Sequence, residues 1–110
     1  MNRFGVTAFL VVVLVLGGCQ ASGVSEQQRI GEMVQAVYAA IASPQDPASL
    51  TTIARYGTDT RYYVMIRGWL VQELRGVESQ LEASKDPQLK AKFRQKADFL
   101  RTAIRRIDLE

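Results

Sequence analysis

Residues 58–110 read TDTRYYVMIRGWLVQELRGVESQLEASKDPQLKAKFRQKADFLRTAIRRIDLE. On both sides of the segment 84–87, apolar residues recur every three or four positions, which is the spacing of one face of an α-helix. The two series mirror each other, because paired members lie at equal distances from Lys85. The pairs are Leu81 with Leu89, Val77 with Phe93, Leu70 with Leu100, Ile66 with Ile104 and Tyr63 with Ile107, and Leu74 pairs with Ala97 one residue out of step. This symmetry predicts a long antiparallel helical hairpin.

A first amphipathic helix is predicted before the hairpin. Ser25 and Gln28 match a capping box, so we expect the helix to begin at Ser25. It should end at Ser43, because Pro44 disfavours the helical conformation of the residue before it. Its expected apolar stripe consists of Ile30, Met33, Val34, Val37, Ala40 and Ile41.

A short second helix is predicted from Asp46 and Pro47, an N-cap followed by proline at the first helical position. We expect it to run to Tyr56 and to be stopped by Gly57 in the left-handed conformation. Thr58 or Asp59 would then cap the first arm of the hairpin. The second arm begins with the same device, Asp86 and Pro87.

The sequence therefore predicts an all-α fold, a small three-helix bundle with one additional short helix, built on the antiparallel hairpin. No period-two alternation of a β-strand is found after the first eighteen residues. The expected helical domain covers residues 25–110, and residues 19–24 form a polar, small-residue tether before it.

The beginning of the chain has the features of an export signal. Arg3 precedes an apolar run from Phe4 to Leu16, which is shorter than the roughly 20 residues that cross a bilayer. Leu16-Gly17-Gly18-Cys19 resembles the lipobox of bacterial lipoproteins. The resemblance implies that residues 1–18 are a lipoprotein signal peptide and that Cys19, the only cysteine, receives diacylglycerol and then an acyl chain such as palmitate. Two or three chains anchor a protein firmly, whereas one does so only marginally.

Residue Gln20 follows the lipidated cysteine. In lipoproteins of Gram-negative bacteria, a residue other than Asp at this place implies transfer to the outer membrane. We therefore expect anchoring at the periplasmic face of the outer membrane, or at the cell membrane if the host has a single membrane.

Basic residues are concentrated at the end of the chain. The whole chain has a formal net charge of +3, and residues 85–110 hold eight basic and four acidic residues. Four of the basic residues should share an outward helix face and are candidates for contact with anionic lipid or polymer: Lys90, Arg94, Arg101 and Arg105. An ordinary solvated face is the alternative interpretation. The mirror symmetry also predicts an ion pair of Glu78 with Lys92 and a cation–π contact of Trp69 with Arg101.

Aromatic residues cluster at the start of the hairpin. Tyr62, Met65 and Trp69 form a second stripe beside the main one, and they are candidates for binding a partner protein. The structural alternative is that the first helix packs on them. Gly68 and Gly76 would permit close approach of a helix on the same arm.

The sequence offers no support for catalysis. It contains no histidine, no phosphate-binding loop and no metal-ligand motif. We expect no catalytic residues, no metal and no cofactor, and an exported protein is not expected to bind nucleic acid. Two functions remain: a lipid-anchored helical module that scaffolds an envelope protein assembly, or a direct binder of peptidoglycan, lipopolysaccharide or lipid through the basic face. Self-association through uncovered hairpin surface is a third.

Overall fold

Four helices in the order α2, α3, α4, α5 form the part of the protein that the computed structural model describes, residues 21–110. Side chains are described from Ser25 onwards. No strand occurs within this range, and the all-α prediction is confirmed. The signal peptide, lipobox and Cys19 predicted from the sequence lie outside the described residues.

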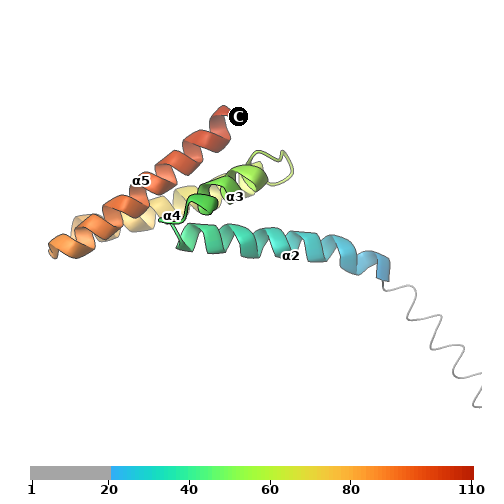
Figure 1. Ribbon diagram of the computed structural model, residues 1–110, viewed down its shortest axis with the longest axis horizontal. Coiled ribbons are helices and arrows are strands. Elements are labelled where there is room, and N and C mark those ends of the chain that lie inside the picture. Colours follow the sequence, from blue (N-terminus) through green and yellow to red (C-terminus); the bar gives the residue numbers. More distant parts are fainter. Residues whose placement is uncertain (1–20) are drawn as a thin grey trace, which may run out of the picture. The chain divides into compact units, whose positions relative to one another are not determined.

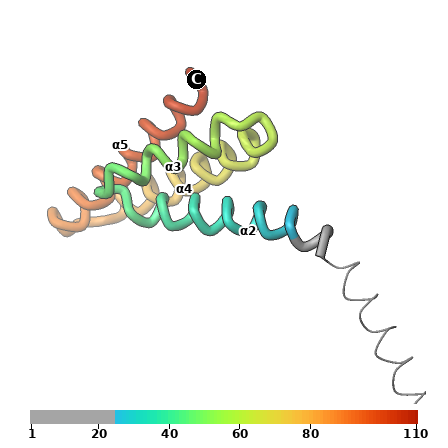
Figure 2. Tube along the Cα trace, turned by 45° about the vertical axis from the view of Figure 1, so that its right-hand side comes forward, coloured from blue at the N-terminus to red at the C-terminus, as the bar shows by residue number. Residues whose placement is uncertain are grey.

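The hairpin consists of α4 (Tyr63–Ala83) and α5 (Pro87–Leu109), which run antiparallel and side by side (Figures 1 and 2). The turn lies where the mirror symmetry places it, and Asp86 accepts a hydrogen bond from the backbone N–H of Gln88 at 3.0 Å. Leu70 and Leu100, an equidistant pair, are both completely buried. The hairpin prediction is therefore confirmed, with its turn at the predicted place.

The chain divides at Glu32 into two parts. In the first part, the structure describes residues 21–32, which are helical throughout and belong to α2 (Ala21–Ala42). The helix thus begins before Ser25, so the predicted capping box at Ser25 is wrong and residues 21–24 of the predicted tether are helical. Ile30, expected in the apolar stripe, is 44% exposed.

In the second part, residues 33–110, the core lies where α2 and α3 (Pro47–Gly57) cover one face of the hairpin. The second half of α2 contributes most of the apolar stripe expected of it. The buried core residues outside the hairpin are Met33, Val37, Ala40 and Ile41 from α2, and Ile53 and Ala54 from α3.

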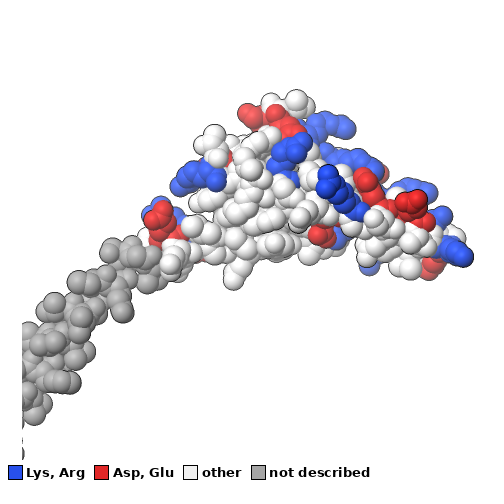
Figure 3. All heavy atoms as spheres, turned by 180° about the vertical axis from the view of Figure 1, so that it is seen from behind, with Lys and Arg blue, Asp and Glu red and all other residues white. Residues whose placement is uncertain are grey.

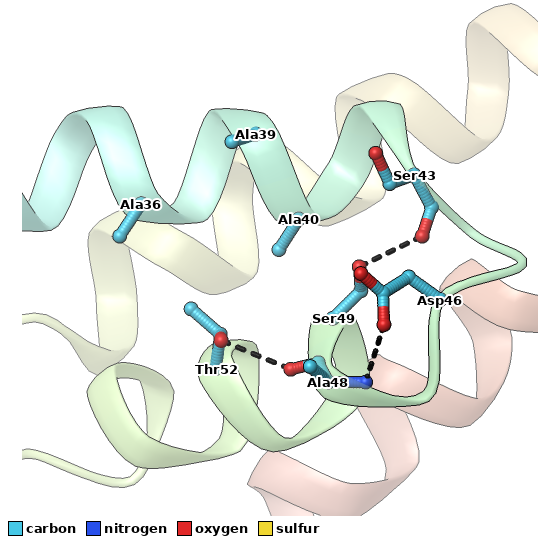
Figure 4. Close-up of a pocket in the computed structure, with 8 residues that line it drawn as sticks. All are labelled: Ala36, Ala39, Ala40, Ser43, Asp46, Ala48, Ser49 and Thr52. Carbon is cyan, nitrogen blue, oxygen red and sulfur yellow. Dashed lines mark hydrogen bonds between the residues drawn. The ribbon is translucent and has the colours of Figure 1, made fainter.

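A tight corner joins α2 to α3 (Figure 4). Asp46 accepts a hydrogen bond from the backbone N–H of Ala48 at 2.9 Å, which confirms the predicted N-cap. The buried hydroxyl of Ser49 donates to the carbonyl oxygen of Ser43 at 2.7 Å. Thr52 donates to the carbonyl oxygen of Ala48 in the same way. The corner therefore satisfies its polar groups locally, and it directs α3 back along α2.

Gly57 is the last residue of α3, but glycine is required there for a reason other than the one predicted. It is a helical, buried residue, and no glycine in the described part has positive φ. A Cβ at this position would lie 2.6 Å from Cγ2 of Ile107 on α5. Gly57 is needed because α3 and α5 approach closely here, so the predicted left-handed stop is wrong.

The hairpin's first arm also begins later than the sequence predicts. Residues 58–62 form turns, and α4 starts with Tyr62 as an N-cap that makes no side-chain hydrogen bond. Asp59 instead accepts hydrogen bonds from the backbone N–H and the guanidinium of Arg61. These bonds hold the pKa of the Asp59 carboxyl below its usual value. The predicted capping of α4 by Thr58 or Asp59 is therefore wrong.

Candidate functional site

A partly exposed aromatic stack lies where α2 meets α4. The rings of Tyr38 and Trp69 are stacked with their centroids 5.2 Å apart and their planes inclined by 29°. Trp69 is half-buried and packs against the core, whereas Tyr38 is 52% exposed. One side of the stack thus belongs to the fold, and the other side is available to a partner.

Met65 extends this surface along α4. It lies one turn before Trp69 and is 37% exposed. A Cβ added at Gly68 or Gly76 would meet nothing within 4 Å, so no element of the described chain approaches these glycines as the sequence suggested. We call Tyr38, Met65 and Trp69 the aromatic surface.

The aromatic surface is also poor in charge. Residues 33–45, which include the second half of α2, contain no Lys, Arg, Asp or Glu, and neither do residues 68–72 of α4. Figure 3 shows a broad uncharged area, with charged side chains gathered to one side and at the edge. A neutral apolar area bordered by charged residues is typical of protein-binding surfaces.

The three predicted partner-binding residues differ in their surroundings. Trp69 and Met65 belong to the aromatic surface, and Trp69 also packs on the first helix through Tyr38, as the structural alternative held. Tyr62 is half-buried against the core, and the guanidinium of Arg61 lies 5.0 Å from its ring centroid. Its ring is therefore less available than the other two side chains.

Tyr38 is the residue of this surface that sequence reasoning missed. It directly follows Val37 of the buried α2 stripe, and by helical period alone it lies just outside that stripe. A large aromatic residue next to the buried stripe, in a stretch without charged residues, is the sequence feature that could have identified Tyr38 as part of a binding surface.

The basic residues of α5 are only partly free to attract anions. Arg101 donates to Glu78 at 3.1 Å and to Asp98 at 3.2 Å, so its charge is balanced within the fold. The predicted Glu78–Lys92 pair and Trp69–Arg101 contact are therefore wrong: Glu78 binds Arg101, and Trp69 stacks on Tyr38. The mirror symmetry predicts which residues lie at the same height along the two helices, but it does not predict which side chains contact each other.

The remaining members of the basic set have separate settings. Arg94 and Arg105 are exposed, and Lys90 is half-buried. Arg105 lies with Arg101 at a shallow groove of about 420 Å³ whose apolar lining includes Leu74 and Ile104. The structure does not gather all four basic side chains into one pocket.

A polar cluster ties the start of α4 to the end of α5. Asp108 accepts hydrogen bonds from the Tyr63 hydroxyl and from the Arg67 guanidinium, whose Nε lies 2.9 Å from Oδ1. Arg67 foremost, and then Tyr63, hold the pKa of the Asp108 carboxyl below its usual value. The bond to this carboxylate raises the pKa of the Tyr63 hydroxyl. All three groups are at the surface, and their partners are one another.

Two negative observations apply to residues 21–110. No group of three or more acidic, cysteine or histidine side chains there is arranged to hold a metal ion. Among the same residues, no helix combines the length and the hydropathy that crossing a membrane requires.

Comparison with known proteins returned no relationship. No protein-family model matches the chain, and neither the curated proteins nor the solved structures include a significant match.

Proposed function

We propose that this protein is a lipid-anchored envelope lipoprotein without enzymatic activity, and that it acts as a helical interaction module for an envelope protein assembly. The observation that carries the proposal is the aromatic surface. Tyr38 and Met65 remain substantially exposed, although the core residues of the fold are buried without them. The export and anchoring steps rest on the sequence resemblance at Leu16–Cys19.

Binding energy at protein interfaces is concentrated in a few aromatic and aliphatic anchors. Tyr38 and Trp69 are suited to this role because their stacking fixes both rings before a partner arrives, so little side-chain entropy is lost on binding. The internal pairing of Arg101 favours this function over the alternative, binding of anionic lipid or polymer through Lys90, Arg94, Arg101 and Arg105.

The test uses the full-length protein in its own host, with a photo-crosslinking amino acid in place of Gln72, an exposed residue of α4 near Trp69. We expect cross-links to one defined envelope protein, identified by mass spectrometry. Tyr38→Ser should abolish the cross-link and leave the melting temperature nearly unchanged, because Tyr38 is half exposed.

Leu109→Ala is the matched control, since it shortens an apolar side chain that is 79% exposed elsewhere on the molecule. It should leave the cross-link intact. Loss of the cross-link when the four basic residues are changed to Gln, together with its retention in Tyr38→Ser, would instead place the contact on the basic face and contradict the aromatic surface as the binding site. That result should also show a strong dependence on salt, because charge contacts are screened over about 8 Å at physiological ionic strength.

Anchoring is tested separately through Cys19. Cys19→Ser removes the thiol that would accept lipid, so we expect loss of metabolic palmitate labelling and accumulation of an unprocessed precursor. A mature-sized, membrane-bound Cys19→Ser protein would contradict the lipoprotein assignment and leave the interaction surface unaffected.

A further inference from the structure

A pocket of about 420 Å³ with both polar and apolar lining lies between the α2–α3 corner and the half of the hairpin nearest its turn. Its volume is within the range typical of small-molecule sites, roughly 300–1,000 Å³. Three elements contribute to it, and all belong to the part of the chain from residue 33 to residue 110. The lining residues are Ala42, Pro44 and Gln45 from the corner, Gln80 from α4, and Lys92, Phe93, Gln95 and Lys96 from α5.

The charge of the lining has one sign. Lys92 and Lys96 contribute two ammonium groups, and no acidic residue lines the pocket. Lys96 donates to Glu73 at 3.1 Å, which holds its side chain in place and compensates part of its charge. Lys92 forms no ion pair with any acidic residue in the described part of the chain. Since lysines four residues apart on a helix repel each other, an anion held between them would relieve this repulsion.

The uncharged lining residues indicate the rest of the ligand. The amides of Gln45, Gln80 and Gln95 can each donate and accept hydrogen bonds, which suits a ligand rich in hydroxyl groups. Phe93 adds an aromatic ring face of the kind on which the C–H faces of sugars pack, and Pro44 adds apolar surface beside it. The two ammonium groups suit an acidic group, the three amides suit hydroxyl groups, and the apolar side chains suit a sugar ring. Together they match one sugar ring that carries an acidic group.

We infer that this pocket binds a small acidic sugar, with its carboxylate or phosphate held by Lys92 and Lys96 and its hydroxyl groups held by the three glutamine amides. The inference is independent of the proposed function, because none of its residues belongs to the aromatic surface or to the four basic candidates Lys90, Arg94, Arg101 and Arg105.

The test is titration of the full-length protein, kept in solution with a non-ionic detergent, by heteronuclear NMR. The probes are glucuronate, glucose 6-phosphate, glucose and acetate. We expect one or both acidic sugars to shift the amide signals of residues 42, 43, 45, 80 and 92–96. Glucose and acetate should bind at least about tenfold more weakly, because glucose lacks the acidic group and acetate lacks the sugar ring. Comparing the two acidic sugars identifies the anion as a carboxylate or a phosphate.

Lys92→Gln should weaken binding of the preferred acidic sugar by about tenfold. Lys85→Gln is the matched control, because it removes the same charge from the hairpin turn outside the pocket, and it should bind as the unmodified protein does. Gln95→Ala should also weaken binding, through a side chain that carries no charge.

Three results would overturn the inference. Acetate could bind as tightly as the acidic sugars, which would reduce the pocket to two lysines that attract any anion. No probe could produce shifts at the lining residues. Finally, Lys92→Gln could lower the melting temperature while leaving binding unchanged, which would assign the lysine to the negative C-terminal end of α2.

Discussion

The middle of the hairpin and its turn-proximal end follow the same apolar pattern, yet their environments differ. Leu70 and Leu100 have no exposed surface, whereas Leu89, in the last pair before the turn, is 45% exposed. Side chains of α2 and α3 cover the middle of the hairpin. At the turn-proximal end, called the tip, α4 and α5 pack only against each other. Helical periodicity therefore predicts which residues face the other helix of the hairpin. These residues are fully buried only where a third helix covers the pair.

The largest expected effect is at the covered middle. Leu70→Ala should lower the free energy of unfolding by about 2–5 kcal/mol, because it removes buried methyl groups and leaves a cavity. Leu89→Ala makes the same chemical change at the tip and should cost less than about 1 kcal/mol. Urea unfolding followed by circular dichroism measures both. Equal losses would show that the tip is covered in solution, by a second copy or another partner.

The contact of α3 with α5 gives the next largest effect. Gly57→Ala should destabilise the protein by about 1–3 kcal/mol, because the new Cβ would overlap Cγ2 of Ile107 within a packed core. The matched change Gly68→Ala has open space around it and should stabilise α4 by about 0.5–1 kcal/mol through helix propensity. Opposite signs in thermal unfolding would confirm that only one of these helical glycines serves a close approach; a stabilising Gly57→Ala would contradict the contact.

A smaller effect is expected at the turn. Asp86→Ala removes the cap of α5 and should cost about 1 kcal/mol, since one backbone N–H loses its acceptor. Asp86→Ser should restore most of the loss, because serine also caps helices. Amide hydrogen exchange should show faster opening of the first turn of α5 in the alanine variant, with the middle of the hairpin unchanged. Equal acceleration in both regions would mean that the hairpin opens as one unit.

The smallest effect concerns pH at the end of the hairpin opposite the turn. Arg67 and Tyr63 lower the pKa of Asp108 in the folded protein, so the folded state favours the ionised carboxylate. The resulting stabilisation is complete above the unfolded pKa of about 3.9 and is lost as the pH falls through the lower folded pKa. Asp108→Asn should therefore lower the melting temperature slightly at neutral pH, and the difference from the unmodified protein should vanish in acid. Glu82→Gln removes a carboxylate that has no ion pair in the described part of the chain, and as the matched control it should leave the melting temperature at neutral pH nearly unchanged.

Sequence reasoning succeeded where the signals are local and failed where side chains from distant segments meet. The caps at Asp46 and Asp86 were predictable because an Asp-Pro pair satisfies a helix start by itself. The start of α4 was not, because residues 58–62 form turns and α4 begins without a side-chain cap. The half-exposed state of Trp69 likewise depends on Tyr38, thirty-one positions away in the sequence.

The amino-acid pattern alone was sufficient for the helical class and the position of the hairpin turn, because period, caps and proline act within a few residues. Tertiary packing was needed to select which part of the stripe is buried, to require glycine at position 57, to pair Arg101 with Glu78, and to assemble the Lys92 pocket from three elements. These features depend on distances between segments that are remote in the chain. Helical period specifies the direction of a side chain, but only the packed helices set what it meets.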